Sequence, residues 1–344
     1  MLRRPFRLLP LLAATWSVGC ATGPHPAITA AVAAVDSERV FAHVEALCHI
    51  GPRPECNREA TEATLQYLEA RLAEAGYAPR REPFEALMLD WVRLPHDGSK
   101  QRWQRMAKRG VTHHNLIAEK AGSGPAAATV IELGAHYDSM PWAPGADDNA
   151  SGVAVVLETA RLLATRPTDK TVRFVFYAME EEGLVGSAAH VKQLIERQDL
   201  PEAALVLDMV GFASDAEDSQ DSPVRIPLVA WVPYTANFIL DAGDFSSGWL
   251  GNLFEDSAAT YVPELPVFSV NRLAGLFEDA ARSDHASYWA AGLDAILLSD
   301  TAEMRNRHYH TPTDQPATLD RTFLQRNAAA VLATMLAWAG PVDS

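Results

Sequence analysis

The first third of the chain carries apolar residues at helical spacing. From Ser37 onward they recur three or four positions apart, at Val40, Val44 and Leu47. After a break at 51–54, which is rich in glycine and proline, a second helix is predicted over about 58–75. Its apolar face consists of Ala60, Leu65, Leu68 and Leu72. Two helices therefore precede the first predicted strand.

Further along, short apolar runs alternate with amphipathic helices. Strands are predicted near 82–92, 114–119, 130–135, 172–178, 204–209 and 295–299. Helices are predicted over 152–163, 184–197 and 321–338. This alternation is typical of an α/β sheet with helices on both faces. We therefore predict a three-layer α/β/α fold with a mixed, mostly parallel central sheet, formed by one domain over 37–341.

The N-terminus has the three-part shape of a secretory signal. Three arginines, Arg3, Arg4 and Arg7, precede an apolar stretch over 8–18 that is too short to span a bilayer. Gly19 and Cys20 resemble a bacterial lipoprotein cleavage site, with Cys20 becoming the lipidated first residue, and a plain signal peptide cut near Ala21 is the alternative. We therefore expect an exported protein, with 1–20 as signal and 21–36 as a tether.

Lipidation would decide where the exported protein resides. If Cys20 carries a lipid, we expect the chain on the periplasmic face of a bacterial outer membrane, and otherwise in the periplasm or secreted. Membrane contact would then come only through that anchor. An exported compartment also permits a disulfide between Cys48 and Cys56, although two separate thiols fit the sequence as well.

Composition excludes some classes of protein and some kinds of site. The 344 residues are 48% hydrophobic, which is typical of an ordinary globular protein. The formal net charge of -15 argues against nucleic-acid binding, which needs a basic face. No pair of cysteines has the spacing of a thiolate zinc site, so a metal would depend on imidazole and carboxylate ligands.

Three candidate ligands follow predicted strands directly. These are His136, Glu181 and Asp208, and ligands in open α/β sheets bind beyond the carboxyl ends of strands. Asp138, two residues after His136, can face the same way and fix the tautomer of that imidazole. A lone histidine is more often structural, so HYD by itself is a weak signal.

Two acidic phrases add to this set. GADDNASG holds two aspartates in a tight loop before a helix, and one aspartate would suffice to cap that helix. MEEEGLVGS places three glutamates after a strand, where like charges repel unless a cation compensates or the glutamates are a solvated helix start. A carboxylate held rigidly in the first phrase could bridge two cations, and in the second phrase a metal would compensate one glutamate and leave a neighbour free as a general base.

The C-terminal third supplies the last candidates. The phrase HYHTPTD contains His310 in a loop made rigid by Thr311 and Pro312, which favours His310 as a ligand. Asp284, in RSDHASYW, is expected to orient His310. The predicted ligand set is His136, Asp148, Glu181, Asp208 and His310, an odd number that suits two cations sharing one carboxylate.

Taken together, these phrases resemble the co-catalytic zinc aminopeptidases of metallopeptidase family twenty-eight, over roughly 49–320. The resemblance implies two Zn²⁺ ions, one held by His136 and Asp208, the other by Glu181 and His310, with Asp148 between them. It implies that Glu180 is the general base. Asp138 is counted with Glu180 among the catalytic residues because it would orient His136. Residues 212–271 match poorly and are expected to form a variable lobe at the mouth of the site, with one strand at 226–232.

The resemblance implies a hydrolase for peptides with a free N-terminus. A water shared by two zinc ions would lose a proton near neutral pH, and Glu180 would pass that proton to the leaving amine. Glutaminyl cyclases share the fold and most ligands but bind one zinc, and a lipoprotein that binds without catalysis is a further alternative. A carboxypeptidase would need a cationic clamp for a carboxylate, for which the sequence offers no candidate. The preferred N-terminal residue, the native metal and the oligomeric state do not follow from the sequence.

Overall fold

The computed structural model describes residues 23–93, 103–221 and 233–342. Its centre is an eight-stranded sheet in the order β1-β2-β4-β3-β5-β8-β6-β7. The strands are β1 (Arg80–Arg93), β2 (Trp103–Lys120), β3 (Val130–His136), β4 (Thr171–Tyr177), β5 (Ala204–Leu207), β6 (Ile239–Gly243), β7 (Val267–Ser269) and β8 (Ala295–Ser299). The four central strands β4, β3, β5 and β8 run parallel, and β1, β2 and β6 introduce antiparallel pairs. The predicted mixed α/β sheet is confirmed.

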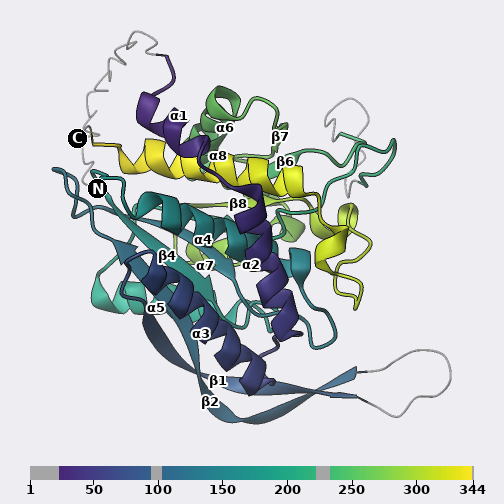
Figure 1. The fold of residues 1–344 in the computed structure, drawn as a ribbon. Helices are drawn as coiled ribbons and strands as arrows, with labels where there is room; N and C mark the ends of the chain where they lie inside the picture. The colour runs from purple at the N-terminus through teal and green to yellow at the C-terminus, as the bar shows by residue number, and fades with distance from the viewer. Residues whose placement is uncertain (1–22, 94–102, 222–232, 343–344) are drawn as a thin grey trace, which may run out of the picture.

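Helices cover both faces of this sheet (Figure 1). One face packs against α1 (Pro26–Val32), α2 (Ser37–Ile50), α3 (Arg58–Glu74), α4 (Gly152–Leu163), α6 (Gly248–Tyr261) and α8 (Arg321–Ala339). The other face packs against α5 (Val185–Arg197) and α7 (His285–Ala290). Alternate strand residues therefore enter two separate cores: Leu205 and Leu207 face α4 and α8, while Val206 faces α5 and α7.

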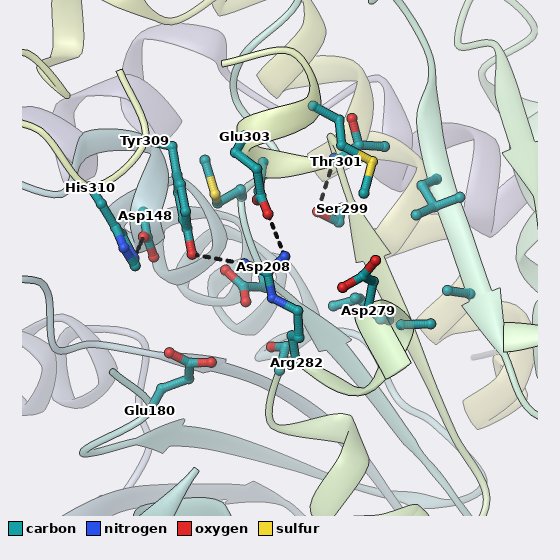
Figure 2. A pocket seen from close by; sticks show the side chains of 18 residues that line it. Asp148, Glu180, Asp208, Asp279, Arg282, Ser299, Thr301, Glu303, Tyr309 and His310 are labelled. Atoms are coloured by element: carbon teal, nitrogen blue, oxygen red, sulfur yellow. Dashed lines mark hydrogen bonds and ion pairs between the residues drawn. The ribbon is translucent and has the colours of Figure 1, made fainter. Parts of the chain in front are cut away.

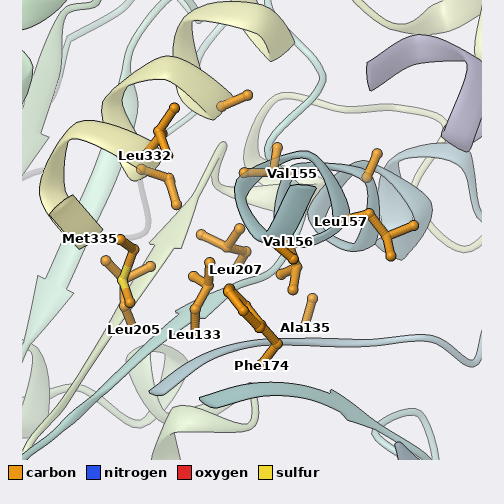
Figure 3. Close-up of a cluster of buried hydrophobic side chains, with 14 of the residues drawn as sticks. Leu133, Ala135, Val155, Val156, Leu157, Phe174, Leu205, Leu207, Leu332 and Met335 are labelled. Atoms are coloured by element: carbon orange, nitrogen blue, oxygen red, sulfur yellow. The ribbon is translucent and has the colours of Figure 1, made fainter. Parts of the chain in front are cut away.

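The larger core explains why the central strands read as continuous apolar runs. Leu133 of β3, Phe174 of β4 and Leu205 of β5 are completely buried and pack beneath α4 and α8 (Figure 3). Strands buried on both faces are mostly apolar, and the buried charges that β3 and β4 do carry, Glu132 and Arg173, pair with each other. This rigid centre determines where the residues that follow each strand lie.

Helices α2, α3 and α8 begin where the sequence provides capping side chains. The side chain of Asp36 accepts hydrogen bonds from the backbone N–H groups at the start of α2, and Asn57 does the same for α3. Asp320 caps α8 by accepting from Phe323 N at 2.8 Å. These caps explain why the predicted helix starts agree with the structure.

Two segments differ from the prediction. Residues 26–32, expected within a tether, form helix α1, whose Ile28 and Ala31 are buried beside α8. Residues 239–269, expected within a variable lobe, contribute β6, α6 and β7 to the sheet and to the core. The strand expected at 226–232 lies outside the described residues, as does the predicted signal segment 1–20.

Two further observations concern the export prediction. Within the described ranges, none of the helices combines the length and the apolar character needed to cross a bilayer. Cys48 and Cys56, the two cysteines that the structure describes, are not joined to each other by a disulfide. The disulfide that an exported compartment would permit between them is therefore not formed in the structure.

Candidate metal centre

Three neighbouring strands deliver candidate ligands to one edge of the sheet. β3 ends at His136, β5 is followed directly by Asp208, and Glu181 comes four residues after the end of β4. Because β4, β3 and β5 are parallel neighbours, their carboxyl ends lie side by side. The strand order thus brings residues from distant parts of the chain to one place.

All five predicted ligands lie at this edge, in two groups of three. His136 Nε2 lies 3.3 Å from Asp148 Oδ1 and 3.3 Å from Asp208 Oδ1. His310 Nε2 lies 3.1 Å from Asp148 Oδ2 and 3.0 Å from Glu181 Oε2. In each group the donor atoms lie within 4.8 Å of one another. Asp148 belongs to both groups and offers one oxygen to each.

The charges in these groups suit divalent cations. Burial and the neighbouring Asp148 raise the pKa of Glu181 to about 7, because several carboxylates share a small, buried space. Burial by itself would lower the pKa of His310, but Asp148 and Glu181 raise it to about 10. Buried carboxylates are stable when they are paired or bound to a metal, and imidazole with carboxylate is a zinc-type donor set. The residues present therefore fit a metal at each group.

A buried arginine shapes the loop that carries Asp148. The Arg53 guanidinium donates to Pro144 O at 2.6 Å, to Gly145 O at 3.0 Å and to Tyr137 O at 3.0 Å. Gly145 has a φ of 66°, and a Cβ at this position would lie 2.4 Å from Asp148 O. Glycine and the arginine together define the turn. Arg53 was not among the predicted site residues, although it lies in the conspicuous sequence HIGPRP at 49–54.

A second clamp comes from the C-terminal phrase. Asp314 Oδ1 accepts from Asp147 N at 3.0 Å, and its Oδ2 accepts from Asp148 N at 3.2 Å. Asn149 Nδ2 donates to Leu207 O at 2.8 Å, which ties the same loop to the end of β5. These three bonds fix the loop on both sides of Asp148, and the bond from Asp148 N fixes its own backbone. Asp314 was also missed, because nothing local in the sequence links it to a loop far away along the chain.

Asp138 lies beside His136 and also binds the loop after β4. Its Oδ1 is 3.5 Å from His136 Nδ1 and accepts from Glu180 N at 3.2 Å. Its Oδ2 accepts from Glu181 N at 3.2 Å. One buried carboxylate therefore connects the end of β3 to the two glutamates that follow β4.

Asp284 does not lie where the sequence suggested. It was expected to orient His310, but no hydrogen bond or ion pair found among the described residues joins the two. Burial raises the pKa of Asp284 to about 7, and the nearby charges that act on it are those of His136, Asp138 and Asp208. Asp284 directly precedes α7 (His285–Ala290) and is not hydrogen-bonded to His310, so the structure does not show the pairing that was expected.

A cavity of about 110 Å³ opens beside the metal groups. The carboxylates of Asp148, Glu180 and Asp208 converge at one end of it (Figure 2). Most of its surface is apolar, with Met209, Leu240, Ala242, Leu297 and Met304, but Asp279, Ser299, Thr301 and Glu303 also line it. The ring of Tyr309 stacks on His310 at 3.7 Å between centroids, and Arg282, which is paired with Glu303, donates to the Tyr309 hydroxyl at 3.4 Å.

A three-layer α/β fold with two groups of imidazole and carboxylate at its strand ends defines a candidate two-metal enzyme. The model of peptidase family M28 matches residues 115–335. The chain belongs to peptidase family M28, whose members are hydrolases of the metallo-exopeptidase type. The match contains all five candidate ligands and the strands of the central sheet from β3 onward.

Two bacterial proteins are similar to this chain in sequence. The chain is 34% identical to the protein YfbL of Escherichia coli over 254 residues, which is 68% of this chain and 73% of that protein. It is 33% identical to the probable lipoprotein aminopeptidase LpqL of Mycobacterium tuberculosis over 230 residues, 63% of this chain. The match spans 44% of the length of LpqL.

Solved structures share the fold at low sequence identity. A zinc aminopeptidase from Bacillus subtilis has a TM-score of 0.68 at 18% identity, covering 88% of this chain and 95% of that one. A glutaminyl cyclase from Porphyromonas gingivalis has a TM-score of 0.60 at 21% identity, covering 88% of this chain and 99% of that one. The fold is therefore common to both kinds of enzyme.

Proposed function

We propose that the chain is a zinc aminopeptidase that removes N-terminal residues from peptides with a free N-terminus. The observation that carries this proposal is the position of Asp148, whose two oxygens each face one histidine, at 3.3 and 3.1 Å. A carboxylate placed in this way suits two cations, as a co-catalytic hydrolase requires. The aminopeptidase names among the relatives support the same substrate class.

In this proposal each group of three holds one Zn²⁺. His136 and Asp208 hold the first ion, Glu181 and His310 hold the second, and Asp148 bridges them. When bound, the ions acidify a water molecule and polarise the scissile carbonyl. The protein fixes the donors: Asp138 holds the backbone of Glu181, and Asp314 holds the backbone of Asp148.

Glu180 is the proposed general base. It lines the cavity beside the metal groups, and its backbone N–H donates to Asp138 at 3.2 Å. Its carboxylate accepts the proton of the attacking water and returns that proton to the nitrogen of the leaving amine. The carboxylates around it provide negative charge for the ammonium group of the substrate N-terminus.

The cavity beside Glu180 is the proposed site of the N-terminal side chain. Its wall is mostly apolar, so leucine is a suitable first residue for a test substrate. Changing Glu180 to Gln is expected to abolish hydrolysis of a leucyl anilide while zinc content stays at the wild-type level, measured by elemental analysis. Wild-type turnover in this variant would overturn the assignment of the base.

Glutaminyl cyclisation is the main alternative, since a cyclase shares the fold. That chemistry uses one zinc, whereas Asp148 lies between two groups of donors. The proposal therefore expects hydrolysis of aminoacyl substrates and no cyclisation of peptides that begin with glutamine.

We also propose that the chain is exported and anchored by a lipid on Cys20. The signal-like pattern of residues 1–20 and the lipoprotein name of one relative support this. Expressed in a Gram-negative host, the protein is expected to fractionate with membranes and to incorporate labelled palmitate. A Cys20→Ala variant that still does both would count against the anchor.

A further inference from the structure

An open groove runs along the molecule where α5 and α7 cover the sheet. It lies between α5 and α7, and we call it the α5–α7 groove. Its α5 side consists of Leu184, Ala188, Val191, Lys192, Ile195 and Glu196, and its α7 side of Ala286, Ser287, Ala290 and Ala291. The α5 residues recur at helical spacing, so they form one continuous stripe. Ile195 is 50% exposed in this stripe and presents apolar surface to a ligand.

The groove is continuous with the metal centre. A shallow hollow on the outer side of the centre is lined by Met140, Glu180, Glu181, Gly183, Leu184, Ala281, Arg282, Tyr309 and His310. This hollow shares Glu180 and His310 with the apolar cavity, and it shares Leu184 with the α5–α7 groove. The apolar cavity therefore leads past the metal groups into the hollow, and the hollow leads into the α5–α7 groove.

The dimensions of the groove suit an extended peptide. From Leu184 to Ile195 the stripe covers eleven helical steps, or about 16 Å at roughly 1.5 Å per residue. A fully extended peptide advances about 3.3–3.6 Å per residue, so about five residues fit along this length. The start of α5 lies next to Glu181, so a peptide leaving the metal centre reaches the groove without turning back.

The chemistry of the groove selects apolar side chains. Lys192 and Glu196 neutralise each other in an ion pair at 3.2 Å, and the other lining residues of both helices are aliphatic apart from Ser287. Ser287 itself is hydrogen-bonded to Ser187 at 2.8 Å. Because the groove is open to solvent, the main chain of a bound peptide stays hydrated while its side chains cover the apolar stripe.

We propose that the α5–α7 groove binds the substrate residues that lie downstream of the scissile bond. The enzyme would then favour extended peptides with apolar residues from the third position onward over dipeptides. This inference rests on the proposed aminopeptidase function and names the substrate class for the same site. The first residue occupies the cavity, the second lies in the hollow, and the following ones lie along α5.

Three substrates that share their first two residues test this proposal. They are leucyl-alanine amide, a six-residue peptide that continues with valine and leucine, and one that continues with serine and glutamine. For the zinc-loaded enzyme, kcat/KM is expected to be about tenfold higher for the apolar hexapeptide than for the polar one, mainly through KM. Ala188→Trp fills the exposed stripe and is expected to remove this preference. The matched control is Ala70→Trp, at an exposed position on α3, which should keep it.

Three other outcomes would overturn the proposal that the α5–α7 groove binds substrate. Equal kcat/KM for the two hexapeptides, or a preference that Ala188→Trp leaves intact, would overturn the groove assignment. A dimer in sedimentation that Ala188→Trp dissociates would assign the groove to a second copy of the chain instead. If leucyl-alanine amide is not hydrolysed either, the proposed function itself fails, and the groove proposal fails with it.

Discussion

Asp148 is the residue on which the account of this site depends most. Its carboxylate lies between His136 and His310, and its backbone N–H is held by Asp314. Burial by itself would raise its pKa, but hydrogen bonds with the two histidines lower it. Asp148 therefore stays ionised in a buried position, as a bridging ligand must.

Glu181 offers a direct test of the second metal group. Glu181→Ala removes one donor of the group formed with His310 and Asp148, so bound zinc is expected to fall from two ions to one per chain. Elemental analysis after dialysis measures this. Glu182→Ala, at the next position and outside both groups, is the control and should keep the wild-type content. Two tightly bound ions in Glu181→Ala would contradict the assignment.

At the scale of elements, a buried ionic cluster joins the sheet to α5. His190 Nδ1 lies 2.6 Å from Glu82 Oε2 of β1, and its Nε2 lies 3.4 Å from Glu132 Oε1 of β3. Glu132 also accepts from Arg173 of β4 at 2.9 Å and from the Tyr288 hydroxyl of α7 at 2.7 Å.

Other groups surround this cluster. Arg80 and Arg197 lie near Glu82, at 3.7 and 3.3 Å, and Tyr177 packs against the His190 ring. Every charge in the cluster has a partner of opposite sign.

This cluster predicts a pH dependence of stability. Burial by itself would lower the pKa of His190, but Glu132 and Glu82 raise it to about 9. The folded state then binds one more proton than the unfolded state between pH about 6.5 and 9. The stabilisation that protonated His190 contributes is therefore complete below pH about 6.5. It is lost as the pH rises to about 9 and above, at up to roughly 1.4 kcal/mol per pH unit.

Urea unfolding at pH 6, 7.5 and 9 measures this effect. The free energy of unfolding is expected to fall across the series in the wild type. His190→Gln keeps a donor but cannot titrate, so its free energy of unfolding should be lower at pH 6 and should change less with pH. Parallel pH profiles for the two proteins would show that His190 is not the titrating group.

At the scale of the whole molecule, the sequence predicted what local patterns determine. The central strands and α4 could be predicted because their apolar periods agree with their buried positions. That the five candidate ligands come together could be predicted because each lies in a short phrase next to a strand end or in a rigid loop. β6 and β7 were missed, since strands of five and three residues carry little periodic signal.

Residues that act across long sequence distances were the hardest to predict. Arg53 binds Gly145, 92 positions away, and Asp314 binds Asp147, 167 positions away. The pairing of Asp284 with His310 could not be judged from the sequence because the position of Asp284 depends on how α7 packs against α5. In each case the partner is determined by the packing of helices on the sheet, which no local pattern contains.

A zinc titration of the metal-free protein tests the central claim most directly. Hydrolysis of leucyl anilide is followed as zinc is added, because the position of Asp148 between two histidines predicts a co-catalytic pair. The account predicts that activity rises until two zinc ions are bound per chain. Full activity at one ion per chain, or cyclisation of an N-terminal glutamine in place of hydrolysis, would contradict it.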